Sequence, residues 1–213
     1  MSKVFYEEFW ETHMDGSLLG KFLSWLREEY WDQHFVQVAL RHTQRGQVLE
    51  AGCGTALSSI LVAERRGDQI TGLDLSPIAL ILARQFAEKH RTPLPLVLGD
   101  MRRMPFPEKS FDVVWNSGTL EHYDEPIPIL QEMWRVGKKV IAIFPERSLP
   151  FTILDWAIRP FSSKIRRSFL NGDEHFRTLR EIRQIFERAG FRRVVVERIR
   201  CLGIFPYVAA IGE

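Results

Sequence analysis

The sequence has few cysteines, no long apolar run and little excess charge. Its two cysteines, Cys53 and Cys201, are spaced for neither a disulfide framework nor a metal motif. A free thiol at Cys53 suits a reducing compartment, so we expect a cytoplasmic protein. No apolar run approaches the roughly 20 residues that a membrane-spanning helix needs. Residues 1–10 carry acids instead of the apolar core of a signal peptide.

Charge and histidine spacing exclude further function classes. The net charge of +2 gives no overall indication of a nucleic-acid partner. The six histidines are scattered, and the sequence shows neither a metal-ligand cluster nor a Ser-His-Asp signature, so we predict no metal site. With 213 residues, 45% of them hydrophobic, the chain suits one globular domain with a small cap.

The most informative stretch covers residues 47–57. An apolar run ends in Glu50 and is followed by Gly52 and Gly54, and then by a helical pattern over residues 57–66. Glycine readily adopts positive φ and lets a ligand approach the backbone closely. The start of the next helix offers N–H groups to a polar ligand. We therefore predict a nucleotide-type site where the first strand meets this helix.

The same turn distinguishes between nucleotides. A dinucleotide fingerprint needs a third glycine where Leu57 stands. The turn instead resembles motif I of the class I S-adenosylmethionine-dependent methyltransferases, E/D-x-G-x-G-x-G. Glu50, Gly52 and Gly54 match this motif, and Ala56 conservatively replaces its last glycine. This resemblance implies that the cofactor is S-adenosyl-L-methionine and the product S-adenosyl-L-homocysteine.

A second carboxylate follows the next predicted strand. Asp74 ends the apolar run over residues 69–73, about 20 residues beyond the glycine turn, where an acid typically binds ribose hydroxyls. Asp74 could instead cap the helix that begins at Pro77, but Ser76 already occupies the capping position. We therefore predict that Asp74 binds the ribose.

Residues 99–115 carry a second resemblance. They read G-D-M-R-R-M-P-F-P-E-K-S-F-D-V-V-W, which is similar to the G-D-x-x-x-L-P-F-x-D-x-S-F-D-x-V segment of ubiquinone/menaquinone-biosynthesis methyltransferases, the type 11 methyltransferase domain. By this resemblance, Asp100 takes the adenine amino group and the backbone of Met101 meets the adenine ring. Acids would then stand at three successive strand ends, and one ligand lying across those ends would account for all three.

Strand-like and helix-like segments alternate along the chain, which predicts an α/β fold. We expect strands over residues 47–50, 69–73, 94–100, 111–115, 138–145, 192–200 and 202–211, and helices over residues 57–66, 77–90, 127–136 and 178–189. The resemblance implies a Rossmann-like, doubly wound sheet of about seven strands. The sheet is expected to be mostly parallel, with the last strand antiparallel between the fifth and sixth.

Two segments lie outside this alternation. Residues 1–44 show aromatic residues at helical spacing and are predicted to form an N-terminal helical cap before a methyltransferase domain over residues 45–213. Tyr6 and Trp10 of this cap either line the site or belong to the core. Residues 146–176 interrupt the pattern after the fifth strand. Their aromatic and basic composition leaves three interpretations open: a substrate lid, a membrane-contacting surface or a packing excursion.

Residues 116–126 resemble the family's loop after the fourth strand, which touches the methionine part of the cofactor and the acceptor. His122 in this loop is the catalytic candidate, either as a general base or as a residue that orders the loop. The resemblance implies ten cofactor-binding residues: Glu50, Ala51, Gly52, Cys53, Gly54, Asp74, Leu75, Asp100, Met101 and Asn116.

The resemblance implies methyl transfer to a small-molecule acceptor, at oxygen, nitrogen or carbon. A sulfonium is already an activated methyl donor, so the protein needs to position the acceptor and exclude water instead of supplying a nucleophile. Two alternatives remain: a nicotinamide-dependent oxidoreductase and a non-catalytic S-adenosylmethionine-binding protein. The acceptor and the oligomeric state are left open.

Overall fold

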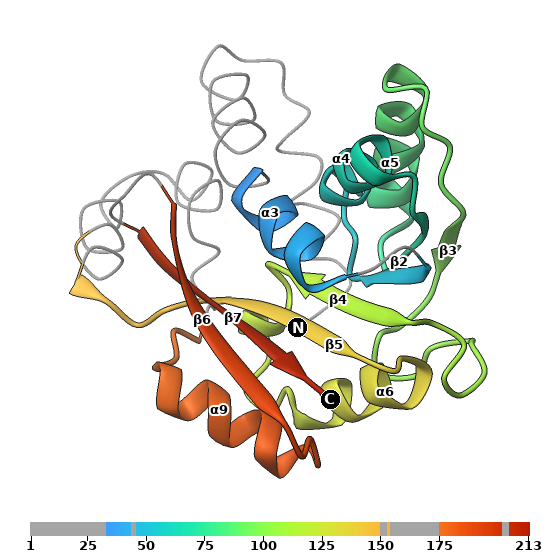
Figure 1. The fold of residues 1–213 in the computed structure, drawn as a ribbon. Coiled ribbons are helices and arrows are strands. Elements are labelled where there is room, and N and C mark those ends of the chain that lie inside the picture. Colours follow the sequence, from blue (N-terminus) through green and yellow to red (C-terminus); the bar gives the residue numbers. More distant parts are fainter. Residues whose placement is uncertain (1–32, 44–45, 150–152, 154–174, 202–204) are drawn as a thin grey trace.

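The computed structural model describes residues 33–43, 46–149, 153, 175–201 and 205–213 (Figure 1). The helices and strands with described bounds are, in chain order, α3 (Gln33–His42), β1 (Gln47–Ala51), α4 (Leu57–Arg66), β2 (Gln69–Asp74), α5 (Pro77–Lys89), β3 (Leu96–Leu98), β4 (Val113–Ser117), η2 (Leu120–His122), α6 (Ile127–Val136), β5 (Val140–Pro145), α9 (Leu179–Arg188), β6 (Val194–Cys201) and β7 (Phe205–Gly212).

These strands form one seven-stranded sheet in the order β3-β2-β1-β4-β5-β7-β6. β1 pairs in parallel with β2 and β4, β2 with β3, and β4 with β5. β7 is antiparallel to both of its neighbours, β5 and β6. The predicted Rossmann-like sheet with an antiparallel last strand is therefore confirmed.

The third strand is shorter than predicted. The sequence indicates residues 94–100, whereas β3 contains only Leu96–Leu98. Pro95 has no N–H to donate to the ladder, although its carbonyl accepts a hydrogen bond from the Gly72 N–H. At the other end the chain turns, and Asp100 forms an isolated bridge with Arg103. Asp100 therefore lies in a turn beyond the strand.

Helices cover both faces of the sheet. Figure 1 shows α3, α4 and α5 on one face and α6 and α9 on the other. Successive residues of β1 point to opposite faces, so Val48 belongs to the core beneath α3 and Leu49 to the core beneath α6 and α9. Because both faces are covered, a ligand is expected at the carboxyl ends of the strands.

Local sequence signals explain several helix ends. Ser76 caps α5 as predicted, since its hydroxyl accepts a hydrogen bond from the Ala79 N–H at 3.2 Å, and Pro77 stands in the first turn. Thr178 and Glu181 form a reciprocal capping box at the start of α9. These caps satisfy backbone N–H groups at the starts of α5 and α9.

Some predictions fall outside the described residues. These are Tyr6 and Trp10, most of the predicted cap over residues 1–44, and most of the lid-like insertion over residues 146–176. They stay predictions. In the part of the chain that the structure describes, none of the helices has the length and apolar character required to span a membrane.

Candidate functional site

The register of the sheet brings the predicted site residues to one edge. Ala51 pairs with Leu73, and Asp74 pairs with Leu98 in the next strand. The ends of β1, β2 and β3 therefore lie side by side, and the segments that follow them meet at the carboxyl edge of the sheet. The glycine turn, Asp74 and the turn containing Asp100 are thus neighbours, as the sequence predicts.

The glycine turn is fixed to the end of β2. The N–H groups of Gly52 and Cys53 both donate to the Leu73 carbonyl, at 2.7 and 3.0 Å. Gly52 has φ +73°, and a Cβ at this position would lie 2.7 Å from Thr119 Oγ1. Glycine is needed here both for its conformation and for the closeness of the loop that follows β4.

Ala56 shows that the last position of the motif also has a glycine-like conformation. Its φ of 54° lies in the left-handed region, which costs an L-residue about 1 kcal/mol. The replacement of glycine by alanine is therefore less conservative for the backbone than the sequence suggests. Ala56 is the N-cap of α4, and its methyl side chain has no polar atom that could cap the helix. The first turn of α4 is therefore suited to receive a polar ligand group.

Asp74 is held by the backbone around it. Its Oδ2 accepts a hydrogen bond from the Gly54 N–H and its Oδ1 one from the Ser76 N–H, each at 2.8 Å. Burial raises the pKa of Asp74 above its ordinary value, and hydrogen bonds from the backbone of Ser76, Gly54 and Leu75 partly oppose that rise. A carboxylate oxygen can accept more than one hydrogen bond. This fixed carboxylate therefore fits the ribose hydroxyls that the sequence assigns to it.

Asp100 has a different environment. Arg102 Nη2 lies 2.6 Å from its Oδ2, and the Arg102 N–H donates to its Oδ1 at 2.8 Å. This pairing lowers the pKa of Asp100 below its ordinary value. The adenine partner predicted from the sequence therefore already has a charged neighbour. The side chain of Met101 is buried in the core, so its backbone is the part suited to the predicted contact with adenine.

Glu50 and Asn116 contact the protein interior. Glu50 is buried, and one of its carboxylate oxygens accepts a hydrogen bond from the Ser59 hydroxyl at 2.5 Å. Glu50 thus connects β1 to α4. This structural role explains an acid at the end of β1 without a ligand, which the sequence analysis did not consider. Asn116 is fully buried; its Nδ2 donates to the Ala51 carbonyl at 2.5 Å, and its Oδ1 accepts from the Leu120 N–H at 3.2 Å. It joins the end of β1 to the loop after β4.

The remaining predicted residues occupy the same edge. The Cys53 thiol is free and buried, and burial, Asp74 and Glu50 all raise its pKa, so it is a poor nucleophile. Leu75 is half-buried between Asp74 and the Ser76 cap. His122 is half-buried in η2, and its backbone N–H donates to the Thr119 carbonyl at 3.1 Å. The loop that carries His122 therefore also carries Thr119, which contacts the glycine turn.

Arg177 is a site-related residue that the sequence analysis missed. Its guanidinium donates to the Tyr123 carbonyl at 2.6 Å and to the Asp124 carbonyl at 3.2 Å. These contacts connect residues more than 50 positions apart. They involve backbone carbonyls, which leave no trace in the side-chain pattern. His175-Phe176-Arg177 resembles a lead-in that is common in the family, but this resemblance indicates neither these contacts nor a role for Arg177.

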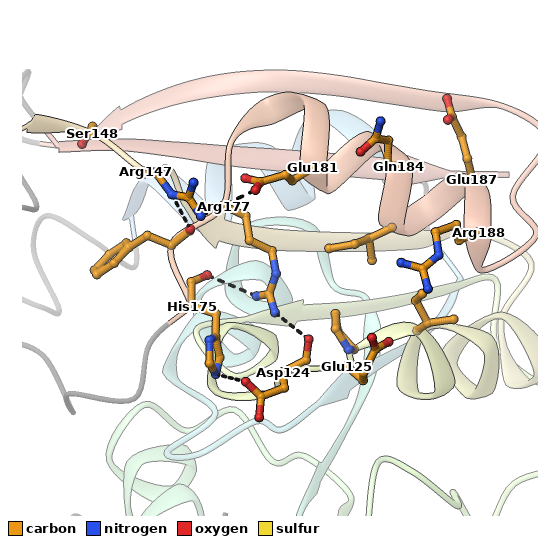
Figure 2. A pocket seen from close by; sticks show the side chains of 14 residues that line it. Asp124, Glu125, Arg147, Ser148, His175, Arg177, Glu181, Gln184, Glu187 and Arg188 are labelled. Atoms are coloured by element: carbon orange, nitrogen blue, oxygen red, sulfur yellow. Dashed lines mark hydrogen bonds and ion pairs between the residues drawn. The ribbon is translucent and has the colours of Figure 1, made fainter.

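A cavity of about 1080 Å³ lies between the start of α6 and α9 (Figure 2). Arg147, Arg177 and Arg188 line it together with carboxylates from the loop before α6 and from α9, including Asp124 and Glu181. Its lining does not include the glycine turn, Asp74 or Asp100. It is therefore separate from the predicted cofactor edge. The described residues contain no group of three or more His, Cys, Asp or Glu side chains placed to hold a metal ion.

The chain is similar to known methyltransferases. Residues 49–140 match the family model described as a methyltransferase domain. A demethylmenaquinone methyltransferase of Bacillus licheniformis is 26% identical over 87% of this chain and 87% of its own length. A demethylmenaquinone methyltransferase of Deinococcus radiodurans is 34% identical over 60% of this chain, but the match spans only 55% of the relative's length.

A solved structure shows the same fold. Magnesium protoporphyrin IX methyltransferase from Synechocystis, crystallised with bound S-adenosylhomocysteine, superposes with a TM-score of 0.69. The match covers 97% of this chain and 94% of the other at 19% identity. At this identity the likeness concerns the fold.

Proposed function

Because residues 49–140 match a methyltransferase domain, we propose that this chain is a class I S-adenosylmethionine-dependent methyltransferase that transfers the methyl group to a small-molecule acceptor. The observation that carries the proposal is the hydrogen bond between the Gly54 N–H and the Asp74 carboxylate. It joins the two sequence features of the cofactor site, the glycine turn and the acid after β2, in one piece of structure.

We propose a distinct role for each part of the edge. Asp74 accepts hydrogen bonds from the ribose hydroxyls, Asp100 accepts one from the adenine amino group, and the turn at Gly52 gives the cofactor close access to the backbone. When bound, the sulfonium supplies an activated methyl group. The protein's own contribution is then to orient the acceptor and to exclude water. His122 is placed in the loop beside the glycine turn and is our candidate to accept a proton from an acceptor that must lose one.

The acceptor is proposed to be an organic molecule with a hydrophobic part. This follows from the aromatic composition of residues 1–44 and 146–176 and from the relatives, two of which are named for demethylmenaquinone. We further propose a cytoplasmic location, which the free, buried thiol of Cys53 supports.

Thermal stabilisation tests the cofactor assignment. A ligand that binds only the folded protein raises the melting temperature. We expect S-adenosylmethionine and S-adenosylhomocysteine to raise it, and NAD to leave it unchanged. Stabilisation by NAD alone would instead favour the oxidoreductase.

A second assay separates an enzyme from a binding protein. Incubation of the purified chain with methyl-labelled S-adenosylmethionine and a metabolite extract is expected to give a labelled small molecule together with S-adenosylhomocysteine. Tight cofactor binding without any labelled product across extracts and quinone-type acceptors would support the binding-only alternative.

A further inference from the structure

We infer that Arg177 is a positioning residue for the cofactor site: its guanidinium holds the loop after β4 against the glycine turn and thereby shapes the end of the site that binds the methionine part of the cofactor. The inference rests on the proposed function. It concerns a residue that lies outside the predicted cofactor edge and contacts none of the glycine turn, Asp74 or Asp100.

Arg177 has an anchored backbone and an almost fully buried side chain. Its relative exposure is 7%, and Glu146 forms an isolated parallel bridge with it directly after β5. The Arg177 carbonyl accepts a hydrogen bond from the Arg147 N–H at 3.0 Å. Every residue of β5 is buried, so the backbone of Arg177 is anchored directly after a strand in the protein interior.

The guanidinium uses this anchor to hold the loop before α6. It donates to the carbonyls of Tyr123 and Asp124, as Figure 2 shows for Asp124, and to that of His175 at 3.2 Å. The His175 N–H adds a bond to the Glu121 carbonyl at 2.7 Å. Residues 121–124 are thus held at three carbonyls by the segment that leads into α9.

The loop held by Arg177 also contacts the glycine turn. Leu120 N–H donates to Asn116 Oδ1, and Thr119 Oγ1 donates to the Gly52 carbonyl at 3.3 Å. A displacement of residues 121–124 would therefore be transmitted to Thr119 and Gly52. Only a planar, multiply donating cation is suited to bridge several carbonyls in this way, because arginine presents up to five N–H groups in a fixed geometry.

The order of the strands tells which part of the cofactor this loop meets. Asp74 follows β2 and Asp100 follows β3, so the adenosine end of the cofactor is assigned to that side of β1. The loop held by Arg177 follows β4, on the opposite side of β1. The methionine part must therefore extend towards this loop, and the adenosine part lies beyond the influence of Arg177.

This separation provides a test that does not need the acceptor. S-adenosylhomocysteine contains both parts of the cofactor, whereas 5′-methylthioadenosine lacks the amino-acid part. We expect Arg177→Met to weaken S-adenosylhomocysteine about tenfold and 5′-methylthioadenosine less than about twofold, measured by isothermal titration calorimetry. Arg177→Lys keeps the charge but not the planar geometry, and is expected to weaken S-adenosylhomocysteine by about threefold.

The matched control is Arg180→Met, which removes an exposed arginine from the first turn of α9 and is expected to change neither affinity.

Equal losses for both ligands in Arg177→Met, or parent-like binding of both, would overturn the inference. Should Arg177→Met fail to fold, Arg177→Lys decides by the same ratio of affinities. If the parent protein binds neither ligand, the proposed function itself fails, and the inference fails with it. If the parent protein binds both ligands and the variants do not weaken one ligand more than the other, only the proposed role of Arg177 is rejected and the proposed function stands.

Discussion

An aspartate ends β2 and another follows β3, but the surroundings of the two side chains differ. Asp74 is half-buried, is held by backbone N–H groups, and has a pKa that desolvation raises. Asp100 is partly exposed, is held by the flexible side chain of Arg102, and has a lowered pKa. The carboxylate after β2 is therefore oriented by the fold itself, whereas the one after β3 depends on a surface ion pair. We expect the first to contribute more to cofactor affinity.

Asp74→Ala is expected to have the largest effect. It removes the proposed acceptor for the ribose hydroxyls, and we expect affinity for S-adenosylmethionine to fall about 100-fold, or about 2.7 kcal/mol, by calorimetry. Glu88→Ala, which removes an exposed acid from α5, serves as the control and should bind normally. Parent-like affinity in a folded Asp74→Ala protein would reject the site as described.

Gly52→Ala tests the backbone side of the comparison. Gly52 and Gly67 have almost the same φ, +73° and +71°, but a Cβ at Gly67 would meet no described atom within 4 Å. We expect Gly67→Ala to lower the free energy of unfolding by about 1 kcal/mol through strain alone. Gly52→Ala, which also overlaps Thr119, should lower it by about 3 kcal/mol. Urea unfolding measures both, and equal losses would contradict the close packing around the glycine turn.

The pH dependence of binding sharpens the contrast between the two carboxylates. Because burial raises the pKa of Asp74, its ionised form is lost at a higher pH than that of Asp100 when the solution is acidified. We expect affinity for S-adenosylmethionine to fall, by up to about tenfold per pH unit, as the pH drops through the raised pKa of Asp74. Asp74→Asn should remove this dependence and Asp100→Asn should preserve it. The reverse result would assign the titration to Asp100.

Changes at the end of β3 are expected to be the smallest. Asp100→Asn should weaken S-adenosylmethionine about fivefold, because one hydrogen bond to adenine is weakened. Arg102→Met should change affinity by less than about threefold, since the Arg102 side chain is 62% exposed and exposed ion pairs contribute little. A larger loss for either variant than for Asp74→Ala would invert the comparison.

The sequence predicted the repeating parts of the fold well. Alternating apolar strands and amphipathic helices, the glycine turn and the Ser76 cap all depend on neighbouring residues, and the structure confirms them. The third strand was drawn too long because its apolar run continues past Pro95 and into the turn at Asp100. An apolar run indicates burial but does not show where the ladder of hydrogen bonds ends.

The side-chain contacts of the site were harder to predict. The role of Asn116 in cofactor binding stays a prediction; its described contacts are with Ala51 and Leu120. The family-like lead-in that contains Arg177 did not indicate the contacts of its guanidinium. The bonds from Asn116 to Ala51 and from Arg177 to Tyr123 each reach a backbone carbonyl more than 50 positions away in the chain. Such contacts depend on how the strands are ordered in the sheet, which periodicity does not reveal. The cofactor roles of the individual residues stay predictions until the binding experiments are made.

The position of β7 has a consequence for how the molecule is assembled. β7 follows β6 in the chain but lies between β5 and β6. During synthesis β6 therefore emerges before the strand that connects it to the rest of the sheet. The cofactor edge at β1, β2 and β3 uses only earlier residues, so a nascent chain can form the proposed cofactor-binding half before β7 is available to pair with β6.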